Sequence, residues 1–168
     1  MNKLSYILTF LILSLLVVIG VTVFVKNKNV SVALIAPVYT DFSVTLPSTT
    51  GPKVTVPNFL KNNAVIEDAQ NPGLYFIGNT FPTATSTNSP TYIVTYDKTT
   101  AYFNIALLSK PLSSARNDAE LYIRNLLKVD DSSLCGLSYT VSVPGYVDEA
   151  ASGVDYRFSF CLDTIKLP

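Results

Sequence analysis

The sequence predicts an α+β fold, in which an N-terminal transmembrane helix precedes an antiparallel sheet with one amphipathic helix packed on it. Three observations predict this architecture. Residues 6–25 contain no charged side chain. Several later segments alternate apolar and polar residues, as half-buried strands do. Residues 112–128 instead repeat their apolar side chains at the spacing of a helix that buries one face.

Residues 6–25 are an uninterrupted apolar stretch, bounded by Lys3 on one side and by Lys26 and Lys28 on the other. A helix of this length spans roughly 30 Å, which matches the hydrocarbon core of a bilayer. The stretch ends in a poor context for signal-peptide cleavage, so we expect an uncleaved signal anchor. A cleaved signal peptide and a buried core helix are the alternatives. The expected organisation is a cytoplasmic tail (1–5), the anchor (6–25), a juxtamembrane linker (26–37) and an extracytoplasmic domain (38–168).

The orientation of the anchor is not decided by charge, because the basic residues on its two sides nearly balance. The short tail before the apolar stretch, the two cysteines and the segment 80–91, rich in threonine, serine and proline, favour export of the domain. We therefore expect a single-pass protein of the cell membrane with a cytoplasmic N-terminus and an extracytoplasmic C-terminal domain.

Alternating patterns predict the strands of this domain. Residues 42–46 and 54–56 alternate on either side of a turn rich in proline, serine and threonine, which predicts a hairpin. Residues 74–77 predict a short apolar strand. Residues 92–96 and 101–108 predict a second hairpin, since a four-residue polar turn separates them. The segment 58–68 is ambiguous, and 80–91 is interpreted as a surface loop, with an inter-domain linker as the alternative.

The helical pattern begins after Pro111, a residue that the first turn of a helix accepts. Arg116 and Glu120 lie opposite the apolar stripe, so we expect an ion pair on the helix surface, with a functional pair as the alternative. Residues 137–143 and 156–160 then alternate as one-face strands. The C-terminal half therefore reads β-β-α-β-β.

The composition excludes several classes of function. Histidine is absent, which removes the commonest general base and excludes nucleophile–histidine pairs within the chain. From residue 38 onward, 9 basic residues face 12 acidic ones, and this acidic balance argues against nucleic acid as a partner. The acidic pairs are interpreted as solvated loop residues, so we expect no catalytic residue, cofactor or metal site. These pairs are Glu67–Asp68, Asp130–Asp131 and Asp148–Glu149.

The chain has two cysteines, Cys135 and Cys161, and they do not form a CxxC motif. If the last two predicted strands pair about the loop 144–154, Leu137 faces roughly Cys161. Cys135 then lies within a short adjustment of disulfide distance. Because an exported domain is in an oxidising compartment, we predict a Cys135–Cys161 disulfide, with two buried free thiols as the alternative.

One set of residues between positions 108 and 161 carries a resemblance to known proteins. These residues are Pro111, Leu112, Ala115, Arg116, Ala119, Glu120, Leu134, Cys135, Ser159, Phe160 and Cys161. Over this range the sequence resembles single-pass membrane-anchored proteins of ultrasmall candidate-phylum bacteria, a group without known activity. The resemblance implies a lineage and no particular chemistry.

These observations favour a non-enzymatic, membrane-tethered extracytoplasmic domain. We expect it to be an interaction or structural component of the cell envelope, or of a secretion or pilus-type assembly, with another envelope protein as its partner. One alternative is a secreted protein that binds a peptide or glycan after signal cleavage. Another is a glycan hydrolase that uses two carboxyl groups across a cleft.

Overall fold

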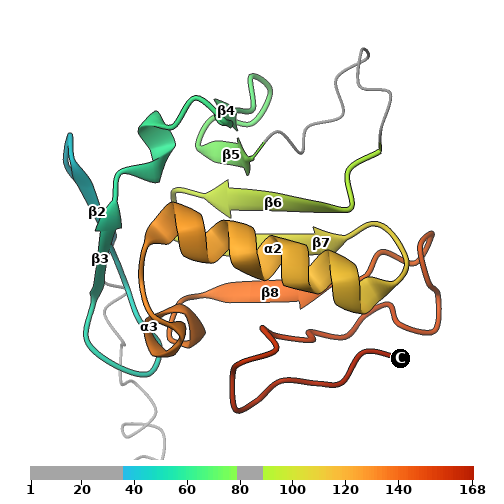
Figure 1. Cartoon of the computed structure of the whole chain (residues 1–168). Coiled ribbons are helices and arrows are strands. Elements are labelled where there is room, and N and C mark those ends of the chain that lie inside the picture. Colours follow the sequence, from blue (N-terminus) through green and yellow to red (C-terminus); the bar gives the residue numbers. More distant parts are fainter. Residues whose placement is uncertain (1–35, 79–88) are drawn as a thin grey trace, which may run out of the picture. The chain divides into compact units, whose positions relative to one another are not determined.

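A computed structural model describes residues 36–78 and 89–168, which form an α+β domain with two sheets and one main helix (Figure 1). The predicted tail (1–5), the predicted anchor (6–25) and all but the last two residues of the predicted linker (26–37) lie outside the described residues. In the two described ranges, no helix combines the length and the apolar character needed to cross a membrane.

The first sheet has three antiparallel strands in the order β1-β2-β3. They are β1 (Val38–Tyr39), β2 (Ser43–Leu46) and β3 (Val54–Pro57). The pairing of β2 with β3 confirms the first predicted hairpin, whereas β1 has only 2 residues and was not predicted. Val44 lies opposite Val56, and Leu46 lies opposite Val54, with all four side chains buried. The alternation seen in the sequence is thus the alternation of buried and outward side chains.

The second sheet has five strands in sequential order, β4-β5-β6-β7-β8. Strands β4 to β7 pair antiparallel, and β6 with β7 forms the second predicted hairpin. The prediction of an antiparallel sheet is wrong for β8, which pairs parallel to β7 because a helical crossover separates the two strands. The strands are β4 (Val65–Glu67), β5 (Leu74–Ile77), β6 (Tyr92–Asp97), β7 (Tyr102–Leu107) and β8 (Tyr139–Ser142).

Two ambiguous segments of the sequence lie beside this sheet. Residues 58–68 contain a short 3-10 helix, η1 (Phe59–Lys61), followed by β4. Most of the segment 80–91 lies outside the described residues, because 79–88 are not described. The strands on its two sides, β5 and β6, pair antiparallel, so the segment connects neighbours within one sheet, as the loop interpretation requires.

Helix α2 (Leu112–Leu127) confirms the predicted amphipathic helix and lies over β6 and β7 (Figure 1). Its buried stripe packs on the inner face of the sheet, where Val94, Phe103, Ile105 and Val141 are also buried. Lys128, directly after the helix, adopts the left-handed conformation that commonly terminates helices. The buried apolar residues of the stripe are Leu112, Ala115, Ala119, Ile123 and Leu127. A second short helix, α3 (Asp131–Cys135), was not predicted.

The predicted strand 156–160 is absent, so the order of the C-terminal half is β-β-α-α-β rather than β-β-α-β-β. Arg157 has a φ of 56°, which breaks an extended run at its second residue. The segment nevertheless covers the outer edge of β8. Tyr156 donates its N–H to the Val141 carbonyl at 2.8 Å, and the Val141 N–H donates to Oδ1 of Asp155 at 2.9 Å.

A tyrosine pair joins the two sheets. The Tyr39 hydroxyl donates to the Lys98 carbonyl at 3.1 Å, so it accepts its other hydrogen bond from the Tyr96 hydroxyl at 2.7 Å. Burial raises the pKa of Tyr96, which keeps this donor protonated. The Phe59 ring packs edge-on against Tyr96 with centroids 5.1 Å apart, so η1 completes the same junction.

Candidate functional site: the cysteine pair and the groove beside β3

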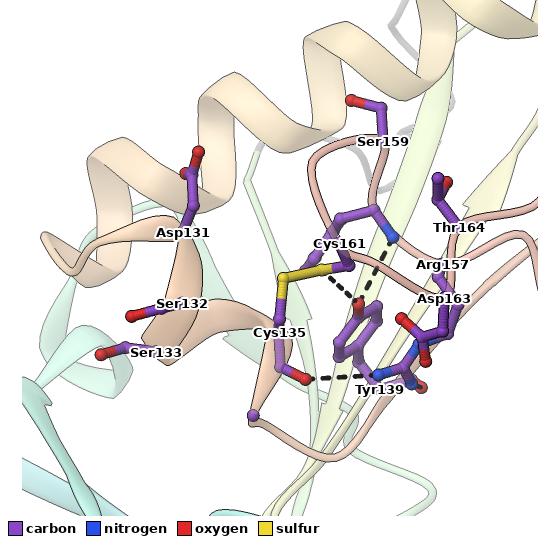
Figure 2. Close-up of a disulfide and its surroundings, with 12 residues drawn as sticks. Asp131, Ser132, Ser133, Cys135, Tyr139, Arg157, Ser159, Cys161, Asp163 and Thr164 are labelled. Atoms are coloured by element: carbon purple, nitrogen blue, oxygen red, sulfur yellow. Dashed lines mark hydrogen bonds and ion pairs between the residues drawn. A yellow bond between two sulfur atoms is a disulfide. The ribbon is translucent and has the colours of Figure 1, made fainter. Parts of the chain in front are cut away.

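The two cysteines come together from α3 and from the irregular C-terminal segment, and they form a disulfide in the structure (Figure 2). Their Cα atoms are 5.6 Å apart. The predicted pairing is therefore the one that the structure contains. The hairpin register that led to it is wrong, because Cys161 follows a turn rather than a strand.

An aromatic stack lies beside the cysteines. The rings of Tyr139 and Phe158 stack with centroids 4.2 Å apart, and Phe160 extends the stack at 5.3 Å from Phe158. The Tyr139 hydroxyl is 3.1 Å from Sγ of Cys161. A disulfide sulfur carries no hydrogen, so the tyrosine is the donor. Burial raises the pKa of Tyr139 and keeps its hydroxyl protonated for this contact.

Arg157 holds the C-terminal segment against α3 and β8, beside the cysteine pair. Its guanidinium donates to the carbonyls of Tyr139 and Cys135, each at 3.3 Å (Figure 2). Its Nε lies 3.0 Å from Oδ2 of Asp163, and its Cζ lies 4.1 Å from the centroid of the Tyr139 ring. A planar cation with five donors suits such a position, because it can stack and donate at once.

The expected surface position of the Arg116–Glu120 pair is wrong. The side chains are only 12% and 5% exposed, because the C-terminal segment covers this face of α2. The Glu120 carboxylate accepts hydrogen bonds from the N–H of Ser159 at 2.5 Å and from its Oγ at 2.6 Å. Nε of Arg116 is 3.7 Å from Oε1 of Glu120, and its Nη1 donates to the Ile165 carbonyl at 3.2 Å. The pair therefore anchors the segment instead of facing solvent.

A groove of about 470 Å³ lies between β3 and α3. One wall is formed by residues 52–55, the other by Val129, Ser132 and Ser133, and the turn between β2 and β3 closes the end. Five hydroxyl side chains line it, and Lys53 is its one charged lining residue. The hydroxyl residues are Ser48, Thr50, Thr55, Ser132 and Ser133.

Gly136 connects the groove to the cysteine pair. The N–H of Thr49 donates to the Gly136 carbonyl at 2.7 Å, directly after Cys135. A Cβ atom at Gly136 would lie 2.7 Å from Oγ of Ser48 and 3.0 Å from Oγ1 of Thr50, so a larger residue here would require these two hydroxyl side chains to move. The cysteine pair thus fixes the end of α3, and α3 forms a wall of the groove.

No family model, curated protein or solved structure matches this chain. The chemistry of the site is therefore inferred from its geometry. Hydroxyl groups, one ammonium and an exposed strand edge can bind a ligand. In the ranges 36–78 and 89–168, no three histidine, cysteine or acidic side chains converge as a metal site would require.

The acidic pairs named in the sequence have local structural contacts. Asp130 caps α3, Asp131 forms a two-point ion pair with Arg124 at 2.7 and 2.9 Å, and Asp148 pairs with Lys110 at 2.7 Å. Glu67 accepts a hydrogen bond from the N–H of Gly73 at 2.9 Å.

The groove between β3 and α3 was not predicted from the sequence, because its walls come from segments about 80 residues apart. The predicted turn at residues 47–52, which is rich in serine and threonine, was its one signal in the sequence.

The cap of α3 is expected to make stability depend on pH. Hydrogen bonds from Ser133 and Ser132 lower the pKa of Asp130 below its ordinary value of 3.8. The stabilisation is therefore present above the unfolded pKa and lost as the pH falls through the lower folded pKa, below about pH 4. Asp130→Asn keeps an acceptor oxygen but does not titrate, so we expect a flatter decline of melting temperature below about pH 4. Identical profiles for the two proteins would contradict this role.

Proposed function

We propose that this chain is a non-enzymatic, membrane-tethered domain that binds another protein of the cell envelope. In this proposal residues 6–25 anchor it, the N-terminus is cytoplasmic, and the domain that begins at residue 38 is extracytoplasmic. The observation that carries the binding role is the groove between β3 and α3. Its volume of about 470 Å³ is within the range of about 300–1,000 Å³ typical of ligand sites.

The organisation of the domain supports binding more than catalysis. The groove is lined by hydroxyl groups and Lys53, and no carboxylate or cysteine is among its lining residues. The charged side chains near the cysteine pair are engaged in holding the C-terminal segment, as described for Arg157 and Glu120. The cysteine pair favours an oxidising compartment, since disulfides persist mainly there. The uncharged stretch 6–25 favours a membrane anchor.

Protease added to intact spheroplasts tests the location. We expect the domain to be digested while a membrane-embedded fragment from residues 6–25 remains. A cytoplasmic protein of known protease sensitivity serves as the control for intact membranes. If the domain survives until the membrane is broken, the domain lies on the cytoplasmic side and the proposed orientation is wrong.

Crosslinking of the full-length protein in its native membrane tests the binding role. We expect the same envelope protein to be recovered in repeated experiments. The amount recovered should fall when an unlabelled copy of this chain is expressed as a competitor. Recovery of the chain alone, with no recurrent partner, would refute the proposed interaction role. Intact-mass measurement of the membrane-bound chain distinguishes an anchored protein from one released by signal cleavage.

A further inference from the structure

Strand β3 is an edge strand, and one row of its backbone groups faces away from β2. The register identifies that row. Asn58 donates its N–H to the Phe42 carbonyl at 2.9 Å, so the pairs 42–58, 44–56 and 46–54 are the hydrogen-bonded ones. The pair Thr45–Thr55 lies between them. The N–H and C=O of Thr55 therefore point outward from the sheet.

These outward groups have no protein partner in the described part of the chain. No backbone or side-chain hydrogen bond reaches the N–H or C=O of Thr55 there. Pro52 precedes the strand and Pro57 is its last residue, and neither has an N–H to donate. The alternation places the backbone of Lys53 on the same side as that of Thr55, so the edge offers a short row of donors and acceptors.

The other edges of the sheets are less open within the described residues. The outer edge of β8 bonds to Asp155 and Tyr156. Strand β4 has 3 residues, one of which, Val65, donates its N–H to Asn62. Strand β1 has only 2 residues. The groove runs along the β3 edge, with Ser132 and Ser133 on its opposite wall.

We propose that the groove binds an extended peptide segment of the partner protein, which adds to the first sheet as a strand alongside β3. This inference rests on the proposed interaction role and names its mode. A neighbouring strand would lie about 4.8 Å from β3 and would satisfy the Thr55 N–H and C=O. Lys53 is exposed and forms no ion pair with a described residue, so it selects a segment with a carboxylate at the facing position.

The decisive variant is Thr55→Pro in the full-length, membrane-bound protein. Proline removes the outward N–H but no hydrogen bond between β2 and β3, and edge strands tolerate proline at such positions. Thr55→Val is the matched control, because it removes the hydroxyl and keeps the backbone donor. A photoreactive residue at Thr50, on the rim of the groove, reports binding, and one at Asn117, on the exposed face of α2, reports contacts elsewhere.

We expect Thr55→Pro to lower the yield of the crosslink from position 50 by about tenfold, while Thr55→Val changes it by less than about threefold. Lys53→Glu should lower the yield, and Lys166→Glu, a charge change outside the groove, should not. Thermal unfolding of each variant checks that it is folded. If Thr55→Pro does not fold, Ser132→Tyr, which obstructs the groove from the other wall, is expected to abolish the crosslink instead.

The outcomes separate this inference from the broader proposal. A crosslinked partner whose yield is insensitive to Thr55→Pro and to Ser132→Tyr would overturn strand addition and leave the interaction role intact. Crosslinks from position 117 and none from position 50 would do the same. Failure of both positions to capture any envelope protein would overturn the interaction role itself. Loss of binding on Thr55→Val would show recognition through the hydroxyl and would overturn recognition through the backbone.

Discussion

Replacement of Glu120 by alanine is expected to lower the free energy of unfolding by about 3 kcal/mol. The substitution removes the acceptor for both hydrogen bonds from Ser159 and leaves Arg116, itself only 12% exposed, without its carboxylate. The Arg116 guanidinium is mostly buried, so it retains much of the cost of leaving water when it loses this carboxylate. Denaturant unfolding followed by circular dichroism measures the change.

Two controls make this prediction specific to the buried carboxylate. Asp118→Ala removes an exposed carboxylate from the same helix and should alter stability by less than about 0.5 kcal/mol. Glu120→Gln keeps a side-chain oxygen that can accept from the Ser159 N–H, so its cost should lie between those of the two alanine variants. Equal stability of Glu120→Ala and Asp118→Ala would show that the contact with Ser159 contributes nothing.

Loss of the cysteine link is expected to destabilise the domain by about 3–4 kcal/mol, according to the chain-entropy model for a loop of this size. The cysteines are 26 residues apart in sequence, and the link restricts the unfolded chain between them. For a domain of this length, the melting temperature should fall by roughly 10–15 °C. The double variant Cys135→Ala/Cys161→Ala and chemical reduction of the wild-type protein should give similar decreases.

Peptide mapping without reduction tests whether the link exists in the native protein. We expect one peptide that joins Cys135 to Cys161 and no alkylation of either residue. Two freely alkylated cysteines in freshly isolated protein would refute the predicted disulfide. Unchanged stability after verified reduction would instead refute its contribution to the fold.

Local patterns were sufficient to predict α2 and both hairpins, because their side chains alternate or repeat with the period of the element that they form. The same rule failed at residues 156–160. Tyr156 and Phe158 are buried and Ser159 is exposed, as the alternation predicted, but the positive φ of Arg157 prevents a strand. The alternating pattern therefore predicted correctly which side chains are buried, but it predicted the wrong backbone conformation.

The position of Glu120 and the presence of the groove depend on contacts between distant segments. Glu120 is polar and lies off the apolar stripe, so the helix pattern alone places it in solvent. Its burial results from a segment about 40 residues later that covers it, which no local rule describes. The walls of the groove are likewise brought together only by the packing of α3 against the turn between β2 and β3.

The cover over β8 also has a consequence for self-association. An uncovered edge strand can recruit the same strand of a neighbouring molecule, which is a common first step of aggregation. Here Asp155 and Tyr156 occupy the Val141 N–H and C=O, and Arg157 occupies the Tyr139 carbonyl. An irregular segment protects the edge without becoming an edge strand itself. The C-terminal residues of the domain therefore contribute to its solubility as well as to its stability.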